Sequence, residues 1–256
     1  MQNSFQIENP NPSFLETSRR GSWWIEPFFT AIGLLAFVVY STWAAFQNEH
    51  YQWESYLSPF YAPLLEYDWW PLSPAFLILW APAGFRLTCY YYRKAYYRSF
   101  MVSPAACAVS TPFGDYKGES RLFLFQNIHR YFMYLAVAYL FVLSYDVLLA
   151  TQFHATGSAT SYGVSVGTLV LMMNVIMLGG YTLGCHSFRH AIGGIRNRFR
   201  NGGGAVAEAC WKSCTKLNKN HGNWAIYSLF WVMFSDFYIY ACTEGWWTDV
   251  VLLGGL

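Results

Sequence analysis

Thiol and imidazole side chains are the residues of this sequence best suited to carry chemistry. The chain has six cysteines and six histidines. Mixed thiolate and imidazole ligands suit zinc, or an iron–sulfur cluster in which two histidines replace two cysteines on one iron. His186 and His190 are four residues apart, so a helix would place them on one face. The spacing contains no compact CxxC pair and does not specify the metal. The candidate metal ligands are Cys89, Cys107, His129, Cys185, His186 and His190.

The elements that must position these residues are predicted to be membrane spans. Of the 256 residues, 55% are apolar and only 12% are charged, about half the charge of an average soluble domain. This composition excludes a disordered chain, a coiled coil and a nucleic-acid-binding domain. Five apolar stretches have the length of about 20 residues that crosses a bilayer core. We therefore predict an all-α membrane protein, a single membrane domain over residues 1–256, with five transmembrane helices. The predicted spans are residues 24–46, 71–91, 128–150, 164–183 and 224–242.

The distribution of charge predicts the orientation of these spans. All 16 Lys and Arg fall at residues 19–20, 86–130 and 189–219, which five spans place on one side of the membrane. Basic segments remain cytoplasmic. We therefore expect a cytoplasmic N-terminus and an outside C-terminus in a multi-pass plasma-membrane protein. The segments on the opposite side contain acidic residues but no Lys or Arg. They are residues 47–70, 151–163 and 243–256.

This topology brings three cysteines and three histidines from separate elements to one depth, near the cytoplasmic face. Thiols on that side stay reduced and available as ligands. His50 and His154 lie in outer loops and cannot join the group, whereas His221 precedes the last span on the inner side and could join it. For each residue taken alone, the alternative is an ordinary hydrogen-bonded core or interface residue.

A haem is the competing metal site. A bis-histidine haem could use two of His129, His186 and His190. A second haem near the outer leaflet would need a histidine within the membrane there, and the sequence has none, which disfavours a two-haem cytochrome. The spacing alone leaves cluster and single haem both open.

Ionisable residues within the spans are further candidates, because such groups are costly in lipid and usually functional. Arg86 lies one turn before Cys89, and Arg130 follows His129, where extension to the membrane interface is the alternative. Asp236 is in the middle of the last span, where a proton path or a quinone role competes with a polar contact between helices.

Four segments resemble the membrane-anchor, cytochrome-b-like subunit of bacterial succinate dehydrogenase, and more narrowly the single-chain, five-span anchors of the mycobacterial Sdh1 type. The resemblance extends over roughly residues 20 to 245. The segments are RLTCYYYRKAYYRSF (86–100), SPAAC (103–107), QNIHRYFMYLA (126–136) and YTLGCHSFRHAIGG (181–194).

The resemblance implies a function in the bacterial plasma membrane. The chain would anchor a flavoprotein and an iron–sulfur subunit on the cytoplasmic face and pass electrons from succinate to menaquinone. A membrane-embedded Rieske-like [2Fe–2S] centre, held by two cysteines and two histidines of the candidate set, would replace the usual haem b. Arg or Tyr donors near the quinone carbonyls would stabilise the charge that develops on reduction. The candidate quinone-binding residues are Arg86, Tyr90, Arg130 and Tyr131.

Two alternatives to this function remain. One is a haem b anchor of the same complex. The other is a cofactor-free membrane scaffold, whose two long basic inner loops, 92–126 and 191–222, dock a cytoplasmic partner or anionic lipid. No catalytic residue is identified, and nothing in the sequence sets the number of copies that assemble.

Overall fold

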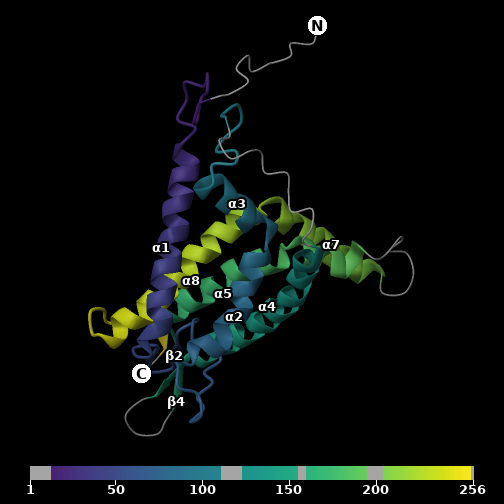
Figure 1. The fold of residues 1–256 in the computed structure, drawn as a ribbon. Helices are drawn as coiled ribbons and strands as arrows, with labels where there is room; N and C mark the ends of the chain where they lie inside the picture. Colours follow the sequence, from purple (N-terminus) through teal and green to yellow (C-terminus); the bar gives the residue numbers. More distant parts are fainter. Residues whose placement is uncertain (1–12, 111–122, 155–159, 195–203, 255–256) are drawn as a thin grey trace. The chain divides into compact units, whose positions relative to one another are not determined.

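The chain is mostly helical, and four of its helices are long and apolar enough to cross a membrane, counted over the described residues. The computed structural model describes residues 13–110, 123–154, 160–194 and 204–254 (Figure 1). The four long helices begin and end within five residues of four of the predicted spans. They are α1 (Ile25–Gln47), α4 (Phe123–Leu149), α5 (Val166–Leu183) and α8 (His221–Thr243).

The stretch predicted as a span over residues 71–91 is instead a shorter helix. Here α2 (Ala75–Thr88) has 14 residues, about 21 Å at the α-helical rise, whereas the bilayer core is about 30 Å thick. Cys89 ends this helix because its backbone is extended, with φ −68° and ψ 126°. The next helix, α3 (Tyr90–Phe100), begins immediately afterwards.

Contacts along the chain define two compact units, residues 1–36 with 90–123 and residues 37–89 with 124–256. In the first unit, Arg98 joins the start of α1 to the segment after α3. Its guanidinium donates to both carboxylate oxygens of Glu26, at 3.0 and 3.1 Å, and to the carbonyl of Ala105 at 2.7 Å. The second unit contains most of the candidate ligands.

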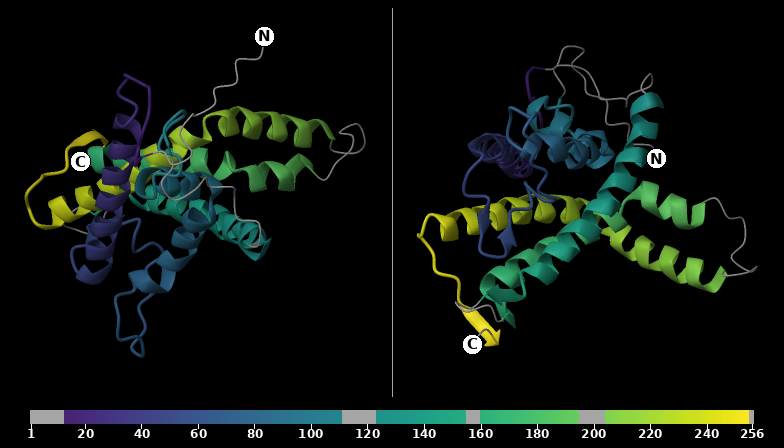
Figure 2. Two further views of the ribbon diagram at one scale, coloured as in Figure 1. Left: turned by 45° about the horizontal axis from the view of Figure 1, so that its top comes forward. Right: turned by 90° about the horizontal axis from the view of Figure 1, so that it is seen from below.

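Helices α5 and α8 form the main helix pair of the second unit. Gly180 of α5 allows close approach, because a Cβ built there would lie 2.5 Å from the ring of Trp224 on α8. Helix α6 (His186–Arg189) and the π-helical turn η1 (His190–Gly194) then pack against α7 (Gly204–Lys219) as a helical hairpin (Figure 2). The Arg189 guanidinium lies 4.5 Å from the Trp211 ring centroid and donates to Thr215 at 2.9 Å.

Short strands connect the helix ends on the side whose segments carry no Lys or Arg, which we call the acidic side. Their backbone groups pair because they have no helical partners there, so the prediction of an all-α chain missed them. Strands β1 and β2 form an antiparallel pair, and β3, β4 and β5 form an antiparallel sheet in that order. They are β1 (Gln52–Trp53), β2 (Tyr56–Leu57), β3 (Gln152–His154), β4 (Thr160–Ser165) and β5 (Val251–Gly254).

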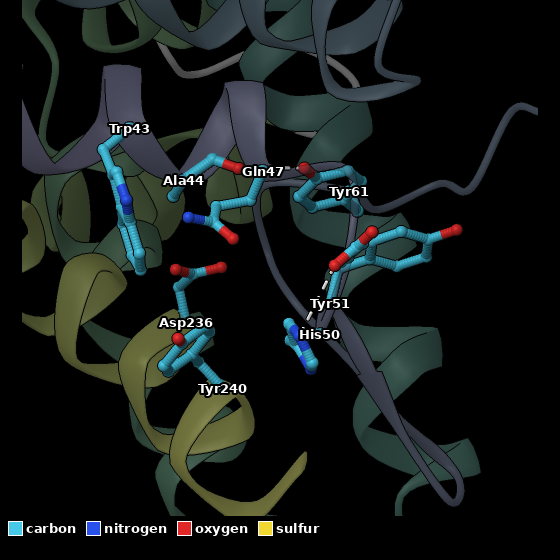
Figure 3. Close-up of a pocket in the computed structure, with 9 residues that line it drawn as sticks. Trp43, Ala44, Gln47, His50, Tyr51, Tyr61, Asp236 and Tyr240 are labelled. Atoms are coloured by element: carbon cyan, nitrogen blue, oxygen red, sulfur yellow. Dashed lines mark hydrogen bonds and ion pairs between the residues drawn. The ribbon is translucent and has the colours of Figure 1, made fainter. Parts of the chain in front are cut away.

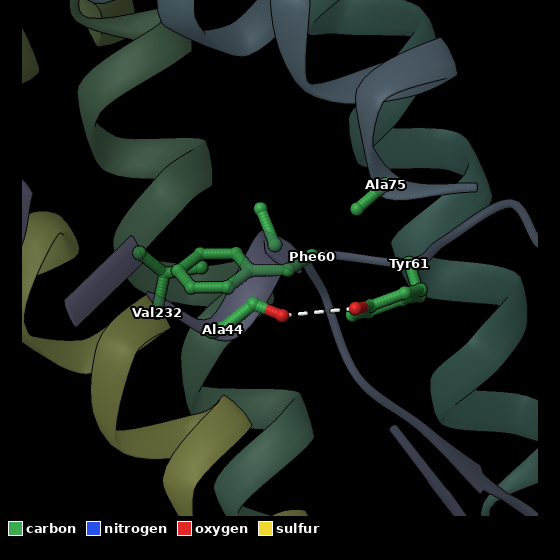
Figure 4. Packing of buried hydrophobic residues seen from close by; sticks show 6 residues of the cluster. Ala44, Phe60, Tyr61, Ala75 and Val232 are labelled. Carbon is green, nitrogen blue, oxygen red and sulfur yellow. Dashed lines mark hydrogen bonds between the residues drawn. The ribbon is translucent and has the colours of Figure 1, made fainter. Parts of the chain in front are cut away.

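A buried apolar cluster holds the segment between β2 and α2 against the helices. The Phe60 ring packs with Ala44 of α1 and Val232 of α8 (Figure 4). The neighbouring Tyr61 donates its hydroxyl to the Ala44 carbonyl at 2.9 Å. This segment is therefore a fixed part of the second unit, with Tyr61 1% exposed.

The close approach of α5 and α8 makes a testable prediction. Gly180→Ala should destabilise the protein by about 1–3 kcal/mol, because the new methyl group overpacks against Trp224. The adjacent Gly179→Ala is the matched control, since nothing lies within 4 Å of its built Cβ and Ala is a better helix former than Gly. Thermal unfolding of the purified protein should show a lower Tm only for Gly180→Ala. An equal Tm for both variants would contradict the close packing.

Candidate metal centre

Two cysteines and two histidines lie together in the second unit, at the ends of helices on the side opposite the acidic side. Cys89 ends α2 and His129 lies near the start of α4. Cys185 stands between α5 and α6, and His221 is the first residue of α8. We call these four residues the Cys–His cluster. Each of the four comes from a different part of the chain, so only tertiary packing brings them together.

Both cysteines occupy breaks between helices. Cys185 precedes α6 in an extended conformation, with φ −64° and ψ 140°, much like Cys89 after α2. The side chain of an extended residue between two helices does not follow the regular helical arrangement of its neighbours. Both side chains are directed into the protein, where Cys89 is 3% and Cys185 is 2% exposed.

His129 is oriented by Thr88, the last residue of α2. The Thr88 hydroxyl donates its proton to the Gly84 carbonyl at 2.7 Å, and its oxygen lies 2.9 Å from His129 Nδ1. Nδ1 must therefore carry the proton and donate to Thr88. This tautomer leaves an unprotonated Nε2, which is 3.2 Å from Cys185 Sγ. A ring nitrogen held in this way is suited to bind a metal.

His221 makes the second thiol–imidazole contact. Its Nε2 lies 3.9 Å from Cys89 Sγ, and its ring stacks on Tyr181 with the centroids 5.1 Å apart. Within the described part of the chain, the buried Nδ1 has no hydrogen-bond partner. A buried polar atom without a partner is costly and calls for an explanation such as a missing ligand.

Burial shapes the electrostatics of the cluster. Desolvation raises the pKa of the Cys185 thiol to about 11, and the nearby Cys89 adds to this effect. The Cys185 thiol is therefore neutral near pH 7, and metal coordination would remove its proton. Across the described residues, no three His, Cys, Asp or Glu side chains form a single metal-binding group. The cluster instead consists of two separate thiol–imidazole contacts.

Three of the six predicted metal ligands take part in these two thiol–imidazole contacts, and the other three do not. Cys89, His129 and Cys185 belong to the Cys–His cluster, whereas His186 and His190 are exposed. Cys107 is exposed in the first unit, where its carbonyl accepts from Arg19 at 3.2 Å.

His221 is not among the predicted metal ligands, and Thr88 is not among the predicted site residues. Helix α8 begins three residues before the predicted span, so His221 is its first residue. The position of His221 at the inner end of the last span was the available signal. For Thr88 there was none, because a hydroxyl contact between α2 and α4 cannot be read from spacing.

The candidate quinone-binding residues lie in different environments. Arg86 is partly buried beside the cluster, 5.0 Å from the Tyr181 ring, and donates to Ser228 on α8 at 3.2 Å. Arg130 donates to Tyr134 at 3.2 Å. Tyr131 is exposed, as is Tyr90 in the first unit. Of the four, Arg86 is the one bonded across helices next to the cluster.

Comparison with known proteins identifies the family. Residues 25–245 match the model of the actinobacterial succinate dehydrogenase subunit SdhC. No curated protein matches the chain. A chain of the Mycobacterium smegmatis Sdh1 complex in the apo form is similar in structure, with a TM-score of 0.81 and 38% identity over 97% of both chains. The protein, with its several membrane-spanning helices, thus belongs to the actinobacterial SdhC family and is a membrane subunit of succinate dehydrogenase.

Proposed function

We propose that this subunit anchors the flavoprotein and iron–sulfur subunits of succinate dehydrogenase and passes their electrons to menaquinone through a Rieske-like [2Fe–2S] cluster. The observation that carries the proposal is the Cys–His cluster, in which helix ends bring two buried thiols into contact with one buried and one partly buried imidazole. A Rieske cluster takes two cysteines on one iron and two histidines on the other. The number and type of donors therefore fit.

Details of the two imidazoles support the same cofactor. Thr88 holds His129 in the tautomer whose Nε2 is free of a proton, as a metal-bound histidine requires. The buried Nδ1 of His221 has no hydrogen-bond partner among the described residues. A ring nitrogen of this kind suits a side chain that binds a ligand. When bound, the [2Fe–2S] cluster would supply one-electron transfer between the partner iron–sulfur protein and the quinone. The chain's own residues hold, orient and desolvate it.

The charged residues suggest how the subunit is oriented and where its substrates meet it. The side of the membrane that carries the Cys–His cluster also carries the basic segments, so we place it in the cytoplasm. The α7 helix there contributes Lys212, Lys216 and Lys219 to a surface for the partner subunits or anionic lipid. Arg86 supplies a fixed positive charge beside the Cys–His cluster. Such a charge stabilises a quinone as it gains electrons.

Metal analysis and EPR of the purified complex test this proposal. Cys89→Ser and Cys185→Ser should each remove one iron–sulfur signal, with a matching loss of iron and acid-labile sulfide, because the serine hydroxyl is a poor substitute ligand. The signals of the partner subunit should remain. Cys242→Ser is the matched control, since this buried cysteine lies near the opposite end of α8.

Three results would refute the [2Fe–2S] assignment. Unchanged signals in both cysteine variants would exclude the Cys–His cluster as its site. A Soret band in the wild-type complex, lost with the histidines, would instead establish haem b. Absence of iron and haem from this subunit would leave an anchor or scaffold without a cofactor.

A further inference from the structure

Asp236 is a carboxyl group buried within α8, far along the helix from the Cys–His cluster and two turns before its end. It is 6% exposed. Tyr40 of α1 donates to Oδ2 at 2.6 Å, and Ser58 donates to Oδ1. No Lys, Arg or His among the described residues forms an ion pair with it. A carboxyl group in a membrane span is costly and is usually retained for a function.

The two partners of Asp236 are compatible with either protonation state. A hydroxyl donates to a carboxylate, and it can rotate to accept from a protonated carboxyl. A lysine or arginine partner would have held the group permanently ionised. Tyr40 and Ser58 hold its position without fixing its charge, so the carboxyl can gain or lose a proton with little rearrangement.

A small pocket connects this carboxyl to the acidic side of the protein. Its walls include Gln47, Glu49, His50, Asp236 and Tyr240, and it has room for about one water molecule. Figure 3 shows the Gln47 amide and the Asp236 carboxyl pointing toward one another, with His50 farther along the pocket. A single water there would have several polar groups to bind.

The outer wall of the pocket bears groups that exchange protons with water. His50 Nε2 lies 3.1 Å from a carboxylate oxygen of Glu244 and 3.7 Å from one of Glu49, whose side chain is 74% exposed. Imidazole exchanges protons near neutral pH. The two carboxylates lie within ion-pair distance of the ring when it carries a proton.

The phenols near the pocket do not compete for this role. Burial, followed by the hydrogen bond to Glu66, raises the pKa of Tyr51 to about 12. Burial also raises the pKa of Tyr61. Both phenols therefore keep their protons near neutral pH. The other ionisable side chains that line the pocket are Glu49, His50, Asp236 and Tyr240.

We propose that Asp236 is a proton-binding site that exchanges protons with the aqueous phase on the acidic side, through the pocket and by way of His50. The protonated imidazole gives its proton to a water in the pocket, and that water passes one to the Asp236 carboxylate. The products are a neutral imidazole and a carboxylic acid, and the imidazole regains a proton from the bulk. The proposal is independent of the cofactor in the Cys–His cluster.

Infrared spectroscopy of the purified complex tests the proposal directly. The C=O band of protonated Asp236 should be present in wild type, absent from Asp236→Asn, and shifted on transfer to D₂O. Asp146→Asn is the matched control, because it removes a carboxyl from another spanning helix, α4. Its spectrum should keep the Asp236 band.

Variants of the pocket test the route without altering the carboxyl. Gln47→Leu, which replaces a polar wall group by an apolar one, and His50→Gln, which cannot carry a proton, should each slow the D₂O shift of the Asp236 band at least tenfold. Assembly of the complex checks that both variants fold. The proposal is overturned if wild type has no Asp236 band, or if both variants exchange as fast as wild type.

Discussion

His221→Ala should abolish the iron–sulfur signal proposed for this subunit, whereas His186→Ala and His190→Ala should leave it unchanged. The structure gives a direct reason, because His221 is directed at Cys89 while the other two histidines are exposed. In the proposed [2Fe–2S] site, removing one of four ligands would leave an iron incompletely coordinated, so the expected loss of the signal is complete. EPR and iron content of the assembled complex measure it.

A second substitution separates ligation from packing at this position. The His221 ring stacks on Tyr181, and alanine removes that contact together with the nitrogen. His221→Phe keeps an aromatic ring on Tyr181 but has no donor atom, so it too should lose the signal while preserving assembly. Retention of the signal in both His221 variants, or its loss in His186→Ala or His190→Ala, would show that the ligand set is different.

Thr88→Val should weaken binding of the proposed [2Fe–2S] cluster by about 10–100-fold. This is the usual cost of losing a partner that orients a metal-bound histidine. Valine matches threonine in shape but cannot accept the Nδ1 proton of His129. The imidazole is then free to rotate and to change tautomer. The fraction of cluster retained during exposure to a chelator measures the effect, and the reduction potential should rise as the imidazole becomes a weaker donor.

The control for this experiment is Thr88→Ser, which keeps the hydroxyl. Serine can still donate to the Gly84 carbonyl and accept from His129, as Thr88 does, so retention and potential should return toward wild type. A merely structural role of Thr88 would change stability and leave the potential unaltered. Equal cluster retention and potential in Thr88→Val and wild type would refute the orienting role.

Hydropathy was sufficient to locate the helices that can cross the membrane. Backbone groups in lipid must be satisfied internally, so an uninterrupted apolar stretch of spanning length has few alternatives to a helix. The stretch over residues 71–91 departs from this rule because α2 begins only at Ala75, after Pro74, and the extended backbone at Cys89 ends it. Hydropathy does not report that break in the backbone.

The order of spans and charges also limited which residues could meet. Depth in the membrane follows from distance along the chain, and it predicted one level for Cys89, Cys107, His129, Cys185, His186 and His190. Asp236 was likewise recognisable as an ionisable group within a span. These conclusions need only the sequence, because the helical rise and the bilayer thickness convert residue number into depth.

Tertiary structure alone decided which side chains face one another at that depth. Rotation about the helix axis and the packing of α2, α4, α5 and α8 turn His221 inward and leave His186 and His190 exposed. The same packing places Thr88 against His129, and Tyr40 and Ser58 against Asp236. Such contacts join residues 41 to 196 positions apart. Local sequence sets the depth of a residue, whereas the partners of its side chain depend on how separate helices pack.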